Sequence, residues 1–560
     1  MQSFTLYAIL MIEHNNRRNA GFCLQLRLIK MKRHTLKRNM LLCLAALLLA
    51  GCSDGGDERT ATPASNVVIR QAGGPRLTRL EFLAADNPGL LVGDVVCTIV
   101  GDSVAECWVP HVMAGKRLVP RFTIEGTDST VQQARLMAGD TSIESSRTAV
   151  DFTSPVTLTL TPADDGQPWK KDYTVLVHAF TGLPVLWVET EGRAAVESKE
   201  DYVRATFRLV EDVVTRAPSD VLQIEGQIRG RGNTTWALPK KPYKMKLDAK
   251  ASLLGMPADK SWVLLANYTD KTMLRNALAL RMAAIDGRGY APRSHFVELM
   301  LNGRYEGTYQ LCEKVELSRH RVDVGGDGFL LEADAKAKGD PDARLFYVRH
   351  IEAPINVKEP GVDYGDEDFA YVRDFVTKAD SVLFSEGFTD PVDGWRKYMD
   401  MDSFVDWYLV NEIARNNDAI MFSSCYMHLP RGGRLRMGPV WDFDIAFGNV
   451  SYNGNYEPEG FWVRRQAWFD RMFWDPAFRA RVKERFAFLH SRLDDILDGI
   501  NADAAYLRRS AQENENRWGT LYEKTWPNRD VWGCYENEVQ CMKQWLTRRM
   551  DWLREEFGKM

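Results

Sequence analysis

The sequence predicts an α+β protein in which an all-β domain precedes a larger domain of mixed helices and strands. Three observations support this prediction. The chain has 560 residues, more than one compact domain usually holds. Residues 66–184 consist of short strand-like runs between turn residues, whereas helix-like and strand-like patterns mix from 185 to 560. The composition, 45% hydrophobic and 26% charged, is that of a globular protein and excludes a disordered or collagen-like chain.

Residues 1–51 predict an export leader. Basic residues between Lys32 and Arg38 precede the apolar run Leu41–Ala50, which is shorter than the roughly 20 residues that span a bilayer. Leu49-Ala50-Gly51-Cys52 follows and resembles the bacterial lipobox, in which the cysteine is acylated and becomes the mature N-terminus. We therefore expect lipidation at Cys52; the alternative is an ordinary signal peptide with a chance cysteine. The signal lies unusually far from residue 1, so Met31 is a candidate for the true start.

Residues 52–65 predict a flexible tether, because small and polar residues dominate them. The acidic stretch Ser53–Glu58 resembles the surface-export signal of Bacteroidetes lipoproteins. These features predict a protein held by its lipid anchor in the bacterial outer membrane and exposed at the cell surface.

The charge of the chain argues against a nucleic-acid partner. The whole sequence has 72 Lys/Arg and 76 Asp/Glu, but residues 1–51 hold eight of the basic residues and one of the acidic ones. The remainder is therefore acidic, whereas nonspecific nucleic-acid binding needs a basic surface.

Residues 66–184 predict a β-sandwich of immunoglobulin-like type, because short strands follow one another at regular spacing. The strand-like runs are Leu77–Leu83, Val95–Val100, Val104–Val109, Leu118–Ile124, Val156–Leu160 and Asp172–Ala179. No catalytic pattern accompanies them, so we expect a spacer or docking module that folds independently. Cys97 and Cys107 flank the turn at Gly101 and either form a disulfide or remain two buried thiols.

The mixed region contains a glycine turn followed by a basic strand. Arg231, Gly232 and Asn233 lie in the turn, and Lys244 and Lys246 share one face of the strand that follows. Backbone amides of such a turn can bind phosphate oxygens, and a lysine on the next strand can neutralise them. A glycine-containing hairpin with a solvated lysine face is the alternative.

A second pattern places carboxylates at both ends of a hairpin. The spacing predicts a helix over Asp402–Ala414 with Asp402 as its cap, then Asp418, strands over Ala419–His428 and Leu435–Val440, and finally Asp442-Phe443-Asp444. Protein kinases place a catalytic aspartate and a metal-binding aspartate in this order. One carboxylate then lies near the acceptor hydroxyl and the other binds Mg²⁺. The alternative is a surface turn followed by a chance acidic pair.

Several motifs together resemble the spore coat protein H (CotH) kinase family. They are Gly230–Asp248, Trp262–Asn276, Leu301–Tyr309, Glu313–Val315 and Gly438–Gly448. The resemblance implies an atypical kinase-like domain over 185–560. Such a domain binds ATP with Mg²⁺ or Mn²⁺ and transfers the γ-phosphate to Ser or Thr of secreted or surface proteins.

By the same resemblance, Asp418 corresponds to the catalytic aspartate and Asp442 to the metal ligand, with Asp444 close enough to assist. The turn residues Arg231, Gly232 and Asn233, with Lys244 or Lys246, fall where the nucleotide phosphates lie. Arg275 and Glu313 belong to family motifs and are assigned to the nucleotide site, although spacing alone does not identify their contacts.

One departure leaves the function open. Kinases carry an asparagine between the two aspartates, and the spore-coat members carry an amide pair, but this chain has Ser423 and Ser424. A hydroxyl is a poorer Mg²⁺ ligand than an amide or carboxylate oxygen. Either Asp444 replaces the missing ligand, or the protein is a noncatalytic pseudokinase that acts as a surface adhesin or scaffold. Transfer of AMP instead of phosphate is a third function to consider.

Overall fold

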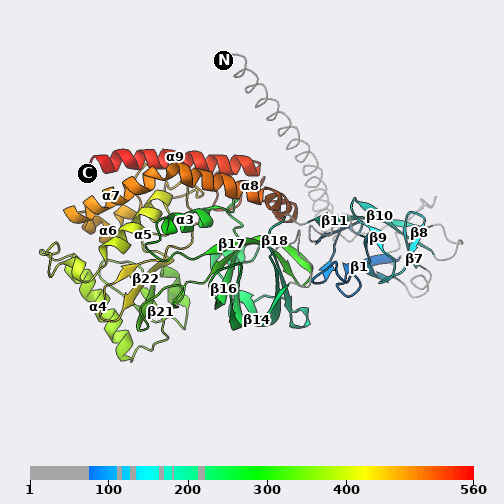
Figure 1. Ribbon diagram of the computed structural model, residues 1–560, viewed down its shortest axis with the longest axis horizontal. Coiled ribbons are helices and arrows are strands. Elements are labelled where there is room, and N and C mark those ends of the chain that lie inside the picture. The colour runs from blue at the N-terminus through cyan, green and yellow to red at the C-terminus, as the bar shows by residue number, and fades with distance from the viewer. Residues whose placement is uncertain (1–74, 110–116, 127–133, 163–168, 180–181, 212–220) are drawn as a thin grey trace, which may run out of the picture. The chain divides into compact units, whose positions relative to one another are not determined.

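The computed structural model describes residues 75–109, 117–126, 134–162, 169–179, 182–211 and 221–560 (Figure 1). Within those ranges the chain forms strands and seven α-helices, which confirms the predicted α+β class. All of the described residues belong to one compact unit, Gly73–Met560. The leader, Cys52 and the tether lie outside the described residues.

Two sheets of the N-terminal region share one core. The first has the order β2-β1-β6, with β2 at Val95–Val96, β1 at Arg76–Phe82 and β6 at Arg121–Glu125. The second has the order β3-β4-β11-β10-β7-β8. Its strands are β3 (Thr98–Val100), β4 (Val104–Val109), β11 (Lys171–Ala179), β10 (Val156–Pro162), β7 (Ala134–Ala138) and β8 (Thr141–Ile143). A small pair, β5 (Arg117–Leu118) and β9 (Val150–Asp151), completes this region.

The two sheets pack face to face as a sandwich. Leu80 and Phe82 of β1 share a hydrophobic cluster with Leu158 of β10 and Val175 of β11, and the backbone N–H of Leu77 donates to the Tyr173 hydroxyl at 2.9 Å. Alternating buried and exposed positions along β10 and β11 produce this packing.

Cys97 and Cys107 are two buried, unbonded thiols. Thr98 of β3 lies opposite Glu106 of β4, so the two cysteines occupy the next facing positions of this hairpin. Of the two predicted outcomes, the structure therefore shows the buried thiols. Burial, reinforced by the hydrogen bond to Cys107, raises the pKa of Cys97.

Seven strands then close into a barrel in the order β12-β13-β14-β15-β16-β18-β17. Their bounds are β12 (Val185–Thr190), β13 (Val203–Val210), β14 (Leu222–Gly230), β15 (Tyr243–Ala251), β16 (Asp259–Leu265), β17 (Ser294–Leu301) and β18 (Arg304–Glu313). Tyr243, Met245 and Leu247 of β15 are buried in the barrel core, as the alternation predicts. The helix α3 (Arg275–Ala284) lies between β16 and β17 in the chain.

A five-stranded antiparallel sheet follows in the order β20-β21-β19-β22-β23. Its strands are β19 (Gly328–Ala333), β20 (Leu345–Phe346), β21 (Ile355–Glu359), β22 (Cys425–Pro430) and β23 (Arg436–Met437). Six helices accompany it: α4 (Glu367–Leu383), α5 (Met401–Ala414), α6 (Ala467–Met472), α7 (Pro476–Ser491), α8 (Leu493–Trp518) and α9 (Tyr535–Gly558). In Figure 1, α8 and α9 run side by side along the helical side of this region.

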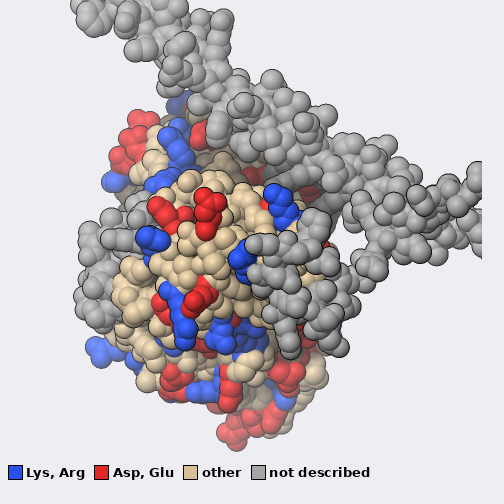
Figure 2. Space-filling view, turned by 90° about the vertical axis from the view of Figure 1, so that its right-hand side faces the viewer, with Lys and Arg blue, Asp and Glu red and all other residues tan. Residues whose placement is uncertain are grey.

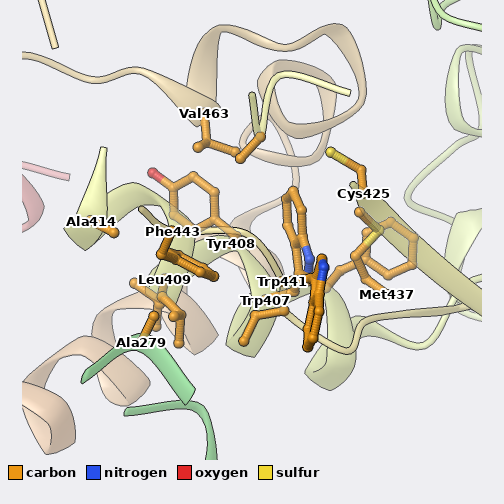
Figure 3. Packing of buried hydrophobic residues seen from close by; sticks show 14 of the residues in the cluster. Ala279, Trp407, Tyr408, Leu409, Ala414, Cys425, Met437, Trp441, Phe443 and Val463 are labelled. Atoms are coloured by element: carbon orange, nitrogen blue, oxygen red, sulfur yellow. The ribbon is translucent and has the colours of Figure 1, made fainter. Parts of the chain in front are cut away.

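The helix α5 is the centre of the largest core. From Phe404 to Ala414 every residue except Asp406 is buried, so this part of the helix is buried nearly all round rather than amphipathic. Figure 3 shows Trp407, Tyr408 and Leu409 of α5 packed among residues from the surrounding segments, including Phe443. Asp402 does not cap this helix. It begins at Met401, and the Asp400 side chain caps it by accepting from the backbone N–H of Ser403 at 3.2 Å.

The sandwich and the barrel share a core. Trp187 of β12 and Met300 of β17 belong to the same hydrophobic cluster as the sandwich residues, as does Tyr305 of β18. The Trp108 ring of β4 lies 5.0 Å from the ring of Tyr305. Residues 66–184 were predicted to fold independently, but in the structure they share buried surface with the barrel.

The surface carries both charges. On the face shown in Figure 2, Lys/Arg and Asp/Glu side chains are interspersed without a continuous basic patch. Within the described residues, no helix has the length and apolar character needed to cross a membrane.

Candidate active site

A pocket of about 710 Å³ lies between the barrel and the five-stranded sheet. The turn after β14 contributes Arg231, Gly232 and Asn233 to its lining. Asp418, Asp442 and Asp444 line it as well. Six of the predicted site residues, separated by up to about two hundred positions in the sequence, therefore share one cavity.

The glycine turn is packed too tightly for other residues. A Cβ at Gly230 would lie 2.4 Å from the ring of Trp236, and one at Gly232, which has φ +85°, would lie 2.2 Å from the Thr235 hydroxyl oxygen. The turn directs Arg231 toward the aspartates, since its guanidinium lies 5.8 Å from the centre of the Trp441 ring. Trp441 directly precedes Asp442, so this arginine brings a positive charge to the loop that carries two carboxylates.

Asp418 follows the sharp end of α5. Arg415 adopts a left-handed conformation with φ 44° and ends the helix. The Asp418 carboxylate then accepts a hydrogen bond from the Asn417 amide at 3.0 Å and forms an ion pair with Lys336 at 3.5 Å. Its side chain is 15% exposed, so it can reach a ligand in the pocket while its orientation is fixed by two partners.

Asp442 has a strained backbone that its neighbours hold in place. Its φ is 68°, a left-handed value that costs a non-glycine residue free energy. The Asn276 amide oxygen of α3 accepts from the backbone N–H of Phe443 at 2.7 Å, and the Ser424 hydroxyl lies 3.3 Å from the Asp442 carboxylate. Burial and the negative charge of Asp418 raise the pKa of Asp442. Strain of this kind is found at functional sites.

Asp444 lies buried between other carboxylates of the pocket. Burial, followed by the charges of Asp442 and Asp270, raises its pKa to about 7. The Thr269 hydroxyl is hydrogen-bonded to its carboxylate at 3.2 Å. Asp444 is therefore only partly ionised at neutral pH, and a positive charge beside it would favour the carboxylate.

Comparison with known families then identifies the chain. A family model described as "CotH kinase protein" matches residues 228–553. The match covers more than half of the chain and includes the whole segment from the glycine turn to α9.

The chain belongs to the CotH kinase protein family.

No curated protein matches the chain. A crystal structure of "a putative glycoside hydrolase" from Bacteroides thetaiotaomicron is similar at 18% identity, with a TM-score of 0.14. That likeness covers 37% of this chain, and the chain spans about half of that protein, 54% of its length.

Four residues assigned to the nucleotide are not among the lining residues of the CotH pocket. Lys244 and Lys246 lie on the outer face of β15, opposite Arg229 and Gln227 of β14. Burial, reinforced by the charges of Lys314 and Arg229, lowers the pKa of Lys244 to about 8. Because of their position, neither lysine is part of the phosphate site proposed below.

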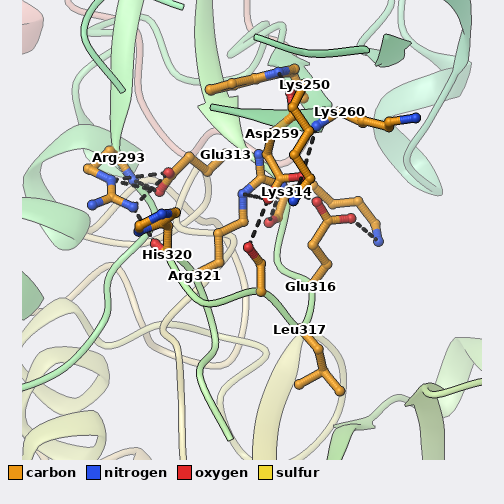
Figure 4. Close-up of polar contacts among 12 residues, drawn as sticks. Lys250, Asp259, Lys260, Arg293, Glu313, Lys314, Glu316, Leu317, His320 and Arg321 are labelled. Carbon is orange, nitrogen blue, oxygen red and sulfur yellow. Dashed lines mark hydrogen bonds and ion pairs between the residues drawn. The ribbon is translucent and has the colours of Figure 1, made fainter. Parts of the chain in front are cut away.

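Arg275 and Glu313 have other partners in the CotH domain. Arg275 is buried, pairs with Asp270 and donates to the Ala446 backbone oxygen at 3.1 Å, so it ties α3 to the aspartate loop. Glu313 is fully buried and forms an ion pair with Arg293 at 2.8 Å (Figure 4). Both contacts indicate structural roles. Arg275 and Glu313 are therefore not assigned to the nucleotide below, and residues that line the pocket take that place.

Sequence patterns missed Lys336 and the amides around Asp418. Lys336 lies in a short 3-10 helix, Ala335–Gly339, which no periodicity predicts. Asn417 and Asn453 line the pocket, and Asn453 donates to the Asn417 amide oxygen at 3.0 Å. The run Asn416-Asn417-Asp418 was the available signal, because consecutive amides and a carboxylate are typical of polar sites.

The carboxylate oxygens of Asp442 and Asp444 suit a hard divalent cation. Among the described residues, no three His, Cys, Asp or Glu side chains already converge as a ready metal centre. Asp442 and Asp444 nevertheless have raised pKa values in one pocket, and a cation between them would relieve the repulsion. Carboxylate and amide oxygens are the ligands that Mg²⁺ and related ions prefer. The two carboxylates therefore fit such an ion.

Proposed function

We propose that the CotH domain is a kinase-like enzyme that transfers the γ-phosphate of ATP to Ser or Thr hydroxyls of secreted or surface proteins. The observation that carries this proposal is the pocket, which brings the carboxylates of Asp418, Asp442 and Asp444 together with Arg231 and Lys336. Phosphoryl transfer requires both kinds of group, carboxylates for the metal and acceptor and cations for the phosphates.

The proposal assigns a role to each side chain. Arg231 and Lys336 neutralise phosphate oxygens, and Asp442 with Asp444 holds Mg²⁺ or Mn²⁺, which supplies charge neutralisation when bound. Asp418 orients the acceptor hydroxyl and takes its proton. A bond then forms between the acceptor oxygen and the γ-phosphorus, the bond from that phosphorus to the bridging oxygen breaks, and ADP leaves.

Paired carboxylate variants test this assignment. Asp442→Asn should abolish metal-dependent ATP binding and transfer together, whereas Asp418→Asn should keep ATP binding and lower turnover by roughly 10²–10⁴-fold. Transfer from γ-labelled ATP to the protein itself and to Ser/Thr-rich acceptors measures turnover, and thermal shift with metal and ATP measures binding. Equal transfer by wild type and both variants would refute the assignment.

A noncatalytic scaffold is the second candidate, and one observation favours it. Ser423 and Ser424 stand where an amide ligand is expected, and the Ser424 hydroxyl is engaged by Asp442. Metal-dependent ATP binding without any transfer would support that function. Label that reaches the acceptor from α-labelled ATP would instead identify AMP transfer.

We also infer that the protein is exported and lipid-anchored at Cys52 in the outer membrane, facing outward. The leader pattern and the lipobox-like Leu49–Cys52 support this localisation. Cys52→Ser should move the protein from the membrane fraction to the soluble one and alter its gel mobility. An unchanged distribution would refute the lipid anchor.

A further inference from the structure

Exposed apolar side chains gather at the mouth of the CotH pocket. Ile420, Phe422 and Trp526 line it and are 36%, 45% and 60% exposed. The ring of Trp526 stacks on that of Tyr452, which also lines the pocket, at 6.1 Å between centres and 11° between planes. Large apolar side chains that remain exposed beside a polar cavity are typical of a binding surface.

The backbone fixes Phe422 in its exposed position. Met421 and Ser424 adopt left-handed conformations with φ 57° and 59°. Met421 is buried in the core, and the next side chain, Phe422, points outward as a result. The Phe422 backbone N–H donates to the Asp418 carbonyl at 3.1 Å, and its carbonyl accepts from Ala335 at 2.7 Å. Two left-handed residues and two backbone hydrogen bonds thus hold Phe422 in an exposed position. Core packing does not explain this arrangement, which costs backbone strain.

The Tyr452 segment is attached to the other side of Asp418. Asn453 and Asn455 both donate to the Asn417 amide oxygen, at 3.0 and 3.1 Å. The Asn417 amide group in turn donates to the Asp418 carboxylate at 3.0 Å. Asp418 is therefore attached to two aromatic segments: Phe422 follows it by four residues, and Asn453, the neighbour of Tyr452, is joined to it through Asn417.

We propose that Phe422, Tyr452 and Trp526 form an acceptor rim, which binds an extended protein segment with an apolar or aromatic residue beside the Ser or Thr that is phosphorylated. This inference rests on the function proposed above, because it takes Asp418 as the group that meets the acceptor hydroxyl. It adds the local sequence that the acceptor must have.

Position favours a protein segment over a nucleotide at this rim. The carboxylates of Asp418 and Asp444 border the Tyr452 ring and, after burial, raise the pKa of its hydroxyl to about 12. Lys336 pairs with Asp418 at 3.5 Å and lies 5.7 Å from the centre of the Phe422 ring, so it balances the charge of Asp418 at the rim. Because the exposed rings lie beside the group that meets the acceptor hydroxyl, the rim suits a protein segment with an apolar side chain that covers them.

Three short synthetic peptides test the rim. Each has a single serine, and they differ only in the flanking residues, which are phenylalanine, alanine or aspartate. Binding to the full chain is measured by fluorescence anisotropy, and γ-phosphate transfer is measured separately. We expect the phenylalanine peptide to bind about tenfold more tightly than the alanine peptide, and the aspartate peptide to bind most weakly.

Two rim variants and one matched control complete the experiment. Phe422→Ala and Trp526→Ala should each remove most of the preference for phenylalanine and leave ATP affinity within about twofold of wild type. Trp532→Ala removes another exposed tryptophan, 48% exposed and outside the pocket lining, and should keep the preference.

Each outcome decides between the alternatives. Equal binding of the phenylalanine and alanine peptides to wild type would overturn the rim. A loss of ATP affinity in Trp526→Ala as large as its loss of peptide affinity would also overturn it, because the ring would then serve the nucleotide. Peptide selectivity without transfer would preserve the rim and refute only the kinase activity.

Discussion

At the scale of single residues, the amide network around the aspartates determines the geometry of the site. Asn276 is buried, accepts from the Phe443 backbone and donates to the Asn267 amide oxygen at 3.1 Å. Its contact to Phe443 is adjacent to the left-handed Asp442, so the asparagine holds the conformation that exposes this carboxylate to the pocket.

Asn276→Ala should therefore destabilise the protein by about 1–3 kcal/mol, the cost of a buried N–H left without an acceptor. It should also weaken metal-dependent ATP binding, because Asp442 is free to leave its left-handed conformation. Thermal unfolding with and without Mg²⁺ and ATP measures both effects. Asn516→Ala, which removes an exposed amide of α8, is the control and should change neither. Wild-type metal dependence in Asn276→Ala would contradict the positioning role.

Sequence patterns located the three aspartates and the glycine turn, because each follows a strand or helix whose periodicity is visible. They could not locate Lys336, nor the amides that reach Asp418 from Asn453, because no local pattern records a contact across more than thirty positions. Lys244 and Glu313 do not line the pocket, and their spacing in the sequence could not show this. A motif gives the order of residues, but barrel closure decides which face of a strand meets the pocket.

At the scale of elements, α9 is joined to α5 by a buried ion pair. Arg549 of α9 and Glu412 of α5 have fully buried side chains and lie 2.7 Å apart. Glu412 also accepts from the backbone N–H groups of Trp462 and Arg464, both at 2.8 Å. Burial lowers the pKa of Arg549 to about 10, but it remains charged at neutral pH. The sequence does not reveal this polar contact, because Arg549 is one of many charged residues of the helix.

Removal of the Arg549 charge alone should destabilise the protein more than removal of both charges of the ion pair. Arg549→Met leaves the Glu412 charge uncompensated and should destabilise the protein by about 3–5 kcal/mol. The double variant Arg549→Met, Glu412→Gln should recover part of that loss, since no buried charge remains. Chemical denaturation of the two variants gives the comparison. A double variant less stable than Arg549→Met would contradict the argument.

At the scale of the whole molecule, the junction between the sandwich and the CotH domain contains a titratable contact. His178 of β11 is hydrogen-bonded to Glu106 of β4 at 2.8 Å and lies 3.7 Å from Glu513 of α8. The Trp108 indole N–H donates to Glu513 at 2.9 Å, and its ring stacks on His178. Burial lowers the pKa of His178, but the bond to Glu106 and the charge of Glu513 outweigh it, so the pKa is raised above 6.5.

The pH dependence follows from that direction. Protonated His178 stabilises the folded junction, so its contribution is complete below pH 6.5, the unfolded value, and is lost as the pH rises through the higher folded pKa. Thermal stability should therefore fall across that interval in wild type, and His178→Gln should reduce the fall. An identical pH profile in the variant would show that other groups cause the change.

Because the sandwich and the barrel share a core, a chain that lacks the sandwich should be less stable than the full protein. A 185–560 chain would expose Trp187, Met300 and Tyr305, which are buried against the sandwich. It should unfold at a lower temperature than the full chain and still show stabilisation by metal and ATP, because the pocket residues are all retained. The nucleotide-dependent thermal shift of both chains tests this, and equal melting temperatures would mean that the shared core adds little.

The closed barrel and the short outer strands also determine where this molecule could pair with a foreign strand. A barrel has no free edge, and the five-stranded sheet ends at two-residue strands on both sides. Among the described sheets, β6 is the one outer strand longer than three residues. Arg121 and Glu125 are exposed at its two ends and oppose hydrophobic stacking of another strand. In a crowded preparation, aggregation through strand addition should therefore begin at Arg121–Glu125 rather than at the described strands of the CotH domain.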